Sequence, residues 1–159
     1  MDEIFFYDKN GKLKIQLRYI VFKQNYVETP EFVVFHENGI VHRKNKPAIE
    51  YENGGWRWYN QGKLHRNMEP AVKFTNGSMH WYSNGLRHRI DGPAVIDPNL
   101  LESWWLNGKR HRINGPATIW KNEYKQWFIN GKEYQFQEYI NLIFPDECKE
   151  KTWFQLKYI

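Results

Sequence analysis

The sequence predicts an all-β fold: a single twisted antiparallel meander of hairpin repeats, with an N-terminal capping hairpin and a short C-terminal helix. Three observations predict it. A motif recurs every 23 residues without insertion, Asn-Gly turn signals recur within it, and polar and apolar residues alternate beside the turns. A fixed period of this size is typical of a repeat architecture, in which each unit buries its apolar face against its neighbours.

The repeat occupies residues 35–134. It comprises four full units, at 35–57, 58–80, 81–103 and 104–126, and a half unit at 127–134. Each unit begins with an aromatic residue, passes a turn glycine and a His-Arg pair, and reaches Pro-Ala before its second hairpin. The leading aromatic residues are Phe35, Trp58, Trp81, Trp104 and Trp127, and the loop prolines are Pro47, Pro70, Pro93 and Pro116.

Asn-Gly between short strands predicts two-residue hairpin turns, because both turn positions need a positive φ. These turns fall in two registers of the unit: Asn53-Gly54 and Asn76-Gly77 in one, and Asn84-Gly85, Asn107-Gly108 and Asn130-Gly131 in the other. The third unit has no glycine at residues 97–100 and would place Asp97 opposite Glu102. We therefore expect a distorted hairpin there.

Two-residue turns fix which residues face each other across the strands. In the second unit Lys73 lies opposite His80, and in the first unit Glu50 lies opposite Arg57. This register puts apolar pairs on one face and an opposite-charge pair on the other, as a half-buried antiparallel sheet requires.

Residues 1–34 lack the repeat but contain Asn10-Gly11, which predicts a hairpin that caps the edge strand of the array. The expected pairs are Phe6 with Ile15, Ile4 with Leu17 and Glu3 with Arg18. Residues 135–159 form the C-terminal cap. Apolar residues at helical spacing predict a helix from Phe136 to Phe144, ended by Pro145, and the tail is apolar enough to pack back onto the array.

The chain has 159 residues, of which 18% are aromatic, and a formal net charge of +5. We expect one elongated domain in which aromatic rings supply much of the buried area. The charge favours an anionic partner but is not concentrated as nucleic-acid binding requires. A single cysteine, Cys148, excludes internal disulfides, and the sequence shows no signal peptide or transmembrane segment, so we expect a cytoplasmic location.

A His-Arg pair recurs in every full unit and forms the His-Arg column: His42, Arg43, His65, Arg66, His88, Arg89, His111 and Arg112. Successive two-strand units lie about 10 Å apart, so four arginines in a row could bind a polyanion. The alternative is architectural: each arginine stacks on a tryptophan or binds a loop carboxylate such as Asp91. The imidazoles are too far apart to share a metal ion, so no metal site is predicted.

A second aromatic column follows the first by one residue: Tyr59, Tyr82, Trp105 and Phe128. If these rings are open to solvent, they form a stacking platform for sugars, bases or a proline-rich strand. The alternative is that the His-Arg loops, the terminal caps or a second subunit cover them.

The sequence contains no glycine-rich phosphate loop, no Gly-x-Ser-x-Gly and no His-Glu-x-x-His. His88 and Asp91 could be drawn as a catalytic pair, but Asn45, Met68 and Asn114 replace that Asp in the other units. We therefore expect no enzyme activity and no cofactor.

The 23-residue period and the segment Trp104-Trp105-Leu106-Asn107-Gly108-Lys109-Arg110-His111 resemble the MORN repeat (membrane occupation and recognition nexus). The resemblance covers residues 35–134. It implies a meandering sheet of hairpins that serves as a scaffold or as a lipid- or protein-binding surface.

The chain departs from that pattern after the histidine. Ordinary MORN units continue His-Gly-x-Gly, whereas residues 88–94 and 111–117 read His-Arg-x-Asp/Asn-Gly-Pro-Ala. This variant is similar to repeat proteins of giant DNA viruses and large phages, so the resemblance implies a viral origin and a place in the host cytoplasm or the virion. Lipid binding is not carried over, because arginine replaces the glycine.

The sequence thus predicts a non-enzymatic interaction or scaffold module that binds a protein or polyanionic partner through a repeated, multivalent surface. One alternative is a nucleic-acid or glycan binder that uses the second aromatic column. For the glycan, the Trp-Tyr-x-Asn-Gly hairpins resemble bacterial choline- and glucan-binding arrays. The other alternative is a self-assembling structural (virion) protein, for example a dimer.

Overall fold

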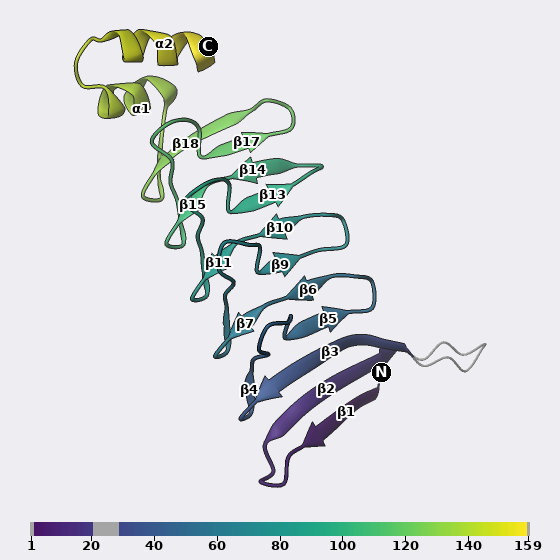
Figure 1. Ribbon diagram of the computed structural model, residues 1–159. Coiled ribbons are helices and arrows are strands. Elements are labelled where there is room, and N and C mark those ends of the chain that lie inside the picture. Colours follow the sequence, from purple (N-terminus) through teal and green to yellow (C-terminus); the bar gives the residue numbers. More distant parts are fainter. Residues whose placement is uncertain (1, 21–28, 159) are drawn as a thin grey trace.

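The computed structural model describes residues 2–20 and 29–158, and it is a long antiparallel meander with two helices at its C-terminal end (Figure 1). Within these residues the main sheet runs in the order β1-β2-β3-β5-β6-β9-β10-β13-β14-β17-β18-β19, with β4 paired to β3. The predicted all-β meander is confirmed. The strands of this path are β1 (Asp2–Tyr7), β2 (Leu13–Ile20), β3 (Thr29–Glu37), β5 (Ile49–Tyr51), β6 (Trp56–Arg57), β9 (Val72–Lys73), β10 (Met79–His80), β13 (Val95–Asp97), β14 (Leu101–Ser103), β17 (Thr118–Trp120), β18 (Lys125–Ile129) and β19 (Lys132–Tyr134).

Each unit also contributes a short hairpin beside the main sheet, which we call a side hairpin. The side hairpins are β7 (Tyr59–Asn60) with β8 (Lys63–Leu64), β11 (Tyr82–Ser83) with β12 (Leu86–Arg87), and β15 (Trp105–Leu106) with β16 (Lys109–Arg110). At the two ends of the array, β4 (Ile40–Val41) and β19 take the equivalent places by pairing with β3 and β18. A unit is therefore a side hairpin, a loop that carries the His-Arg pair, and a main-sheet hairpin.

The N-terminal hairpin has the predicted register. Glu3 pairs with Arg18, Ile4 with Leu17 and Phe6 with Ile15. Strand β2 pairs with β3, so this hairpin extends the main sheet at its N-terminal end. Strand β3 continues through residue 34 into the first repeat unit.

The side hairpins have the predicted two-residue turns. Asn84 and Gly85 have φ values of 50° and 86°, and Ser83 pairs with Leu86 across the turn. Two successive positive φ values define a type I′ turn, which asparagine and glycine tolerate best.

The register predicted for the main-sheet hairpins is wrong by one residue. Met79 pairs with Lys73, and His80 with Val72, because the loop holds three residues, 75–77, instead of two. Only Gly77 has a positive φ there, and the Asn76 side chain accepts a hydrogen bond from the Ser78 amide at 3.0 Å. This is a type I turn followed by a left-handed glycine, the usual three-residue hairpin loop.

The same one-residue correction applies elsewhere in the main sheet. In the first unit Arg57 pairs with Ile49 rather than with Glu50. In the third unit Asp97 pairs with Leu101 rather than with Glu102, and its carboxylate accepts from the Asn99 amide at 3.0 Å. The third hairpin keeps the three-residue length, and its departure lies at Leu100, which has no positive φ at the place that Gly77 occupies.

The interior of the array is thin and depends on small residues. The alanines after the loop prolines, Ala48, Ala71, Ala94 and Ala117, are completely buried. Each of their carbonyls accepts a hydrogen bond from the amide of a leading aromatic residue, as Ala94 does from Trp81 at 2.8 Å. A larger side chain at these positions would separate neighbouring units.

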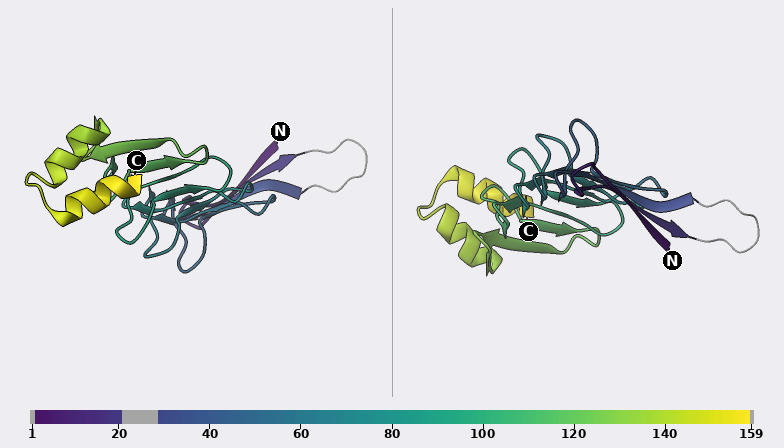
Figure 2. Two further views of the ribbon diagram at one scale, coloured as in Figure 1. Left: turned by 90° about the horizontal axis from the view of Figure 1, so that it is seen from above. Right: turned by 90° about the horizontal axis from the view of Figure 1, so that it is seen from below.

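The C-terminal cap packs on the last strands through a cluster of buried side chains. The predicted helix is confirmed as α1 (Phe136–Ile143), and a second helix, α2 (Lys149–Tyr158), follows where only a packed tail was expected. Both helices lie at one end of the array, and the strands below them fan out with the twist of the sheet (Figure 2). The cluster consists of Trp127, Tyr139, Ile140 and Phe154.

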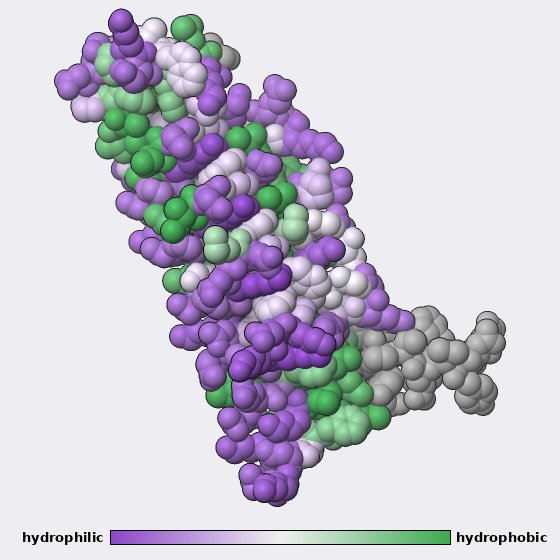
Figure 3. All heavy atoms as spheres, in the orientation of Figure 1, coloured by the Kyte–Doolittle hydropathy of each residue, from purple (hydrophilic) through white to green (hydrophobic). Residues whose placement is uncertain are grey.

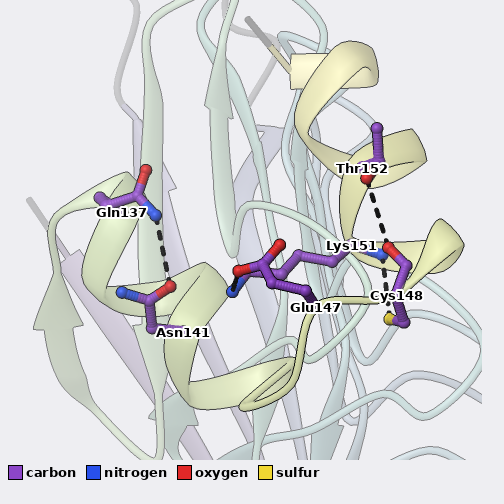
Figure 4. A network of polar contacts seen from close by, with 6 residues as sticks. All are labelled: Gln137, Asn141, Glu147, Cys148, Lys151 and Thr152. Carbon is purple, nitrogen blue, oxygen red and sulfur yellow. Dashed lines mark hydrogen bonds and ion pairs between the residues drawn. The ribbon is translucent and has the colours of Figure 1, made fainter.

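Polar contacts join residues along α1 and around the start of α2 (Figure 4). The Cys148 sulfur accepts from the Lys151 amide at 3.4 Å, as an N-cap does, and Thr152 donates to the Cys148 carbonyl. Lys151 is buried, and its ammonium pairs with Glu147 at 2.6 Å. On α1, Gln137 donates to Asn141 at 3.3 Å.

Replacing Glu123 by glycine is expected to stabilise the protein by about 1 kcal/mol. Glu123 has a φ of 67° in the loop position that Gly54 and Gly77 occupy in the first two units. A higher urea midpoint of Glu123→Gly would show the gain. Glu123→Ala is the control, because it removes the carboxylate but keeps the Cβ that is unfavourable at positive φ. Equal stabilisation by both variants would contradict the backbone explanation.

Candidate binding surfaces along the repeats

The four histidines of the His-Arg column join each unit to the next side hairpin. The Nδ1 atoms of His42, His65, His88 and His111 accept hydrogen bonds of 3.1–3.3 Å from the amides of Gln61, Asn84, Asn107 and Asn130. Each imidazole therefore accepts a hydrogen bond from the first turn residue of the following side hairpin. The adjacent turn glycine donates to the residue before the histidine, as Gly85 does to the Leu64 carbonyl at 2.8 Å.

The arginines of the column fold back onto their own units. The guanidinium carbons of Arg43, Arg66, Arg89 and Arg112 lie 3.6, 4.1, 4.1 and 3.7 Å from the ring centroids of Phe35, Trp58, Trp81 and Trp104. Their Nη1 atoms donate to the carbonyls of Pro47, Pro70, Pro93 and Pro116 at 3.1–3.4 Å. One guanidinium thus holds both the leading ring and the loop of its unit.

Each of these guanidinium groups also has a side-chain oxygen as partner. Arg43 pairs with Glu50 at 3.0 Å, Arg66 pairs with Glu69, and Arg89 pairs with Asp91 at 2.9 Å. Arg112 donates instead to the amide oxygen of Asn114 at 3.1 Å. The hydrogen bond from Arg89 lowers the pKa of Asp91. The structure therefore gives these arginines the contacts that the architectural interpretation requires.

Arg112 and Tyr139 attach the fourth loop to the C-terminal cap. The Tyr139 hydroxyl donates to the Arg112 carbonyl at 2.8 Å and accepts from the Gly115 amide at 3.4 Å. Burial raises the pKa of Tyr139 to about 12, and burial lowers the pKa of Arg112. The hydroxyl is therefore a neutral donor at physiological pH.

The second aromatic column lies on the side hairpins, and arginines outside the His-Arg column contact its rings. Tyr59, Tyr82 and Trp105 are partly exposed, and Phe128 is buried. The guanidinium carbon of Arg87 lies 5.9 Å from the Tyr82 ring centroid and 5.0 Å from that of Trp105. Arg110 lies 5.4 Å from Trp105 and 5.1 Å from Phe128.

Sequence reasoning missed three features of these surfaces. His36 is the first member of the second aromatic column, one residue after Phe35, and the 23-residue spacing could have found it. Arg87 and Arg110 occupy a column of their own, which the same spacing also reveals. The third feature is a row of apolar side chains at the tips of the loops.

These loop-tip residues are Met68, Ile90 and Ile113, and they are 92%, 85% and 58% exposed. They are among the lining residues of two hollows that lie between successive loops. A hollow of about 340 Å³ lies between Met68 and Ile90, with Trp81 and Arg89 among its lining residues. A second, of about 680 Å³, lies between Ile90 and Ile113 and is lined also by Trp104.

Replacing Arg89 by alanine is expected to lower the free energy of unfolding by about 2 kcal/mol, because the ring contact, the Pro93 hydrogen bond and the Asp91 pair are lost together. Chemical denaturation followed by circular dichroism measures the loss. Arg89→Lys should recover less than half of it, since an ammonium cannot stack and donate in the same geometry. An alanine variant as stable as the wild type would contradict the architectural role.

The stability of the protein is expected to fall as the pH decreases from about 6.5 to about 4. Burial, followed by repulsion from Arg87, lowers the pKa of His80 to about 4, whereas unfolding restores a value near 6.5. Between these values the unfolded state binds more protons, so the contribution of His80 is complete above pH 6.5 and lost at pH 4. Solvent screening reduces it to the order of 1–2 kcal/mol.

His80→Gln is the matched control for this pH dependence, because Gln126 occupies the same place in the fourth unit. The variant should lack the His80 component of the pH profile. An NMR titration of the His80 ring should give a midpoint near 4. A midpoint near 6.5, with identical profiles for both proteins, would show that the ring is not desolvated.

Within residues 2–20 and 29–158 no helix is long and apolar enough to cross a bilayer. In the same residues no group of three His, Cys, Asp or Glu side chains could hold a metal ion. The comparisons with known proteins return no relative: no protein-family model matches the chain, and no curated protein and no solved structure is significantly similar to it.

Proposed function

We propose that the protein is a non-enzymatic interaction module that binds a protein partner through the loop edge of its repeats. The observation that carries this proposal is the row of loop-tip residues, which present large apolar side chains to solvent beside two aromatic-lined hollows. Exposed apolar groups arranged around hollows are typical of protein-binding sites.

The architecture of the loop does not require these apolar tips. In the first unit the loop carries Lys44 and Asn45 in the places of Ile90 and Asp91. Met68 has a φ of 60°, a conformation that costs a residue with a Cβ about 1 kcal/mol, and its side chain gains no burial in return. A strained and exposed methionine supports a role outside the fold.

The repetition of the hollows supports a multivalent mode of binding. Successive units advance by about 10 Å, the width of two strands. A polyproline-II segment places every third side chain on one face at about 9.3 Å, so it could fill successive hollows. Linked weak contacts bind more tightly than each alone, because the second contact forms at high effective concentration.

The MORN resemblance is part of this proposal. The 23-residue period and the arrangement of side and main-sheet hairpins support a MORN-like scaffold, and the His-Arg variant of the repeat supports a viral origin. A location in the host cytoplasm or the virion would follow from that origin.

Selection of peptides from a random library tests the proposal. Peptides selected on the wild-type protein should carry apolar residues at intervals of about three. The combined variant Met68→Ser, Ile90→Ser and Ile113→Ser should bind these peptides at least about tenfold more weakly. The matched control combines Leu86→Ser with Leu100→Ser, which removes exposed apolar side chains elsewhere. Peptides that bind both variants alike would contradict the loop edge as the site.

Self-association is the second candidate function, and strand β1 favours it. Within the described residues β1 has a strand neighbour on one side only. Ile4, Phe5, Phe6 and Tyr7 on it are 42–61% exposed, and apolar surface gathers over β1–β3 (Figure 3). An exposed apolar edge strand is a template for pairing with a second copy. Light scattering across a concentration series, with and without a DNA duplex, would separate a dimer, a monomer and a nucleic-acid complex.

A further inference from the structure

Arg87 and Arg110 occupy equivalent places on successive side hairpins, and Trp105 contacts both guanidinium groups. Their Nε atoms are buried and have no hydrogen-bond partner, and the Nε1 atom of Trp105 is in the same condition. Both arginine residues are only partly buried. We call this group the Arg87–Arg110 site.

The fold does not require a cation at these positions. The same place is held by Val41 in the first unit and by Leu64 in the second, and the side hairpins there have the same pairing. An aliphatic side chain is therefore compatible with the same side-hairpin pairing. The two arginines are additions that only the third and fourth units carry.

The two guanidinium groups also have no carboxylate partner among the described residues, in contrast to Arg43, Arg66 and Arg89. Two carboxylates of the third and last units make other hydrogen bonds. Asp97 accepts from the Ser78 hydroxyl at 3.0 Å and from the Asn99 amide, and Glu133 accepts from Gln126 at 3.1 Å. Two charges of one sign are thus held in a row without compensation.

We propose that the Arg87–Arg110 site binds an acidic peptide segment that presents two carboxylates about 10 Å apart. This is the advance of one two-strand unit. An α-helix places residues i and i+7 about 10.5 Å apart on one face, and a polyproline-II helix places i and i+3 about 9.3 Å apart. Each guanidinium would donate hydrogen bonds to one carboxylate in a charge-assisted pair.

The geometry favours a peptide over a nucleic acid. Single strands without sequence preference bind by stacking bases on aromatic faces, and here guanidinium groups already contact Tyr82, Trp105 and Phe128. Two cations also neutralise far fewer phosphates than the roughly six to ten of a typical protein–DNA contact. Carboxylates need only the outer edges of the guanidinium groups.

The site is independent of the loop-edge function proposed above. Neither hollow is lined by Arg87, Trp105 or Arg110. Failure of the loop edge to select peptides would leave this site untouched, and the reverse also holds.

Fluorescence anisotropy with labelled decaglutamate at low ionic strength tests the proposal on the full chain. Arg87→Leu with Arg110→Leu copies the leucine that the second unit has at Leu64, and it should weaken binding by about tenfold or more, because two charge-assisted pairs are lost. Lys63→Leu with Lys109→Leu is the matched control. This control also removes two positive charges, at positions where the third unit naturally has Leu86. It should weaken binding less than about threefold.

Equal losses in the two double variants would overturn the proposal, since binding would then depend on net charge alone. Decathymidylate that binds more tightly than decaglutamate, and is lost in the arginine variant, would overturn the assigned ligand class. A measurement on the wild-type protein tests the site even if the arginine variant does not fold. Decaglutamate should shift the NMR signals of the Arg87 and Arg110 Nε–H groups and leave that of Arg89 in place, and unshifted signals would contradict the site.

Discussion

The His-Arg dipeptide is the joint on which the array depends. In one unit the backbone of His88 bonds to Trp81, its ring accepts from the next side hairpin, and the Arg89 amide donates to Trp105. The Arg89 side chain then returns to its own leading ring and loop. Two adjacent residues therefore align the main sheet and the side hairpins together. An insertion in either hairpin would move the turn away from the imidazole, which explains a 23-residue period without a single break.

Much of the fold follows from the sequence because the repeat makes each signal recur. The meander, the side-hairpin turns, the N-terminal register and helix α1 are as predicted. The register of the main-sheet hairpins differs from the prediction, because Asn-Gly is compatible with both a two-residue and a three-residue hairpin loop. Contacts outside the dipeptide decide which loop forms. Asn84 keeps a positive φ while its amide bonds to His65, whereas Asn76 uses its side chain to cap Ser78. Helix α2 was not predicted, because its apolar residues do not all lie on one face. Phe154 is buried, whereas Trp153 and Leu156 are exposed.

The candidate surfaces were harder to predict because neighbouring columns look alike in the sequence. The arginines of the His-Arg column recur in every full unit, and the structure shows them bonded within the fold. Arg87 and the loop-tip residues vary from unit to unit; Arg87 keeps a buried Nε atom without a hydrogen-bond partner, and the loop-tip side chains are exposed. In a repeat array, differences among units of one chain therefore help to separate residues that build the array from residues available to a ligand.

In the C-terminal cap, aromatic rings contact the last leading aromatic residue in place of the arginine that contacts it in the full units. Trp127 has no arginine after it, and Phe136, Tyr139 and Tyr158 lie 4.8–5.2 Å from its ring centroid instead. This cluster of buried side chains depends on a segment that follows the repeats in the chain. On the ribosome the units therefore emerge before the segment that can anchor them, and each adds only a thin layer to its neighbour. We expect the nascent array to gain lasting order only once this segment has emerged from the ribosome, with consolidation spreading from the cap back towards the first unit.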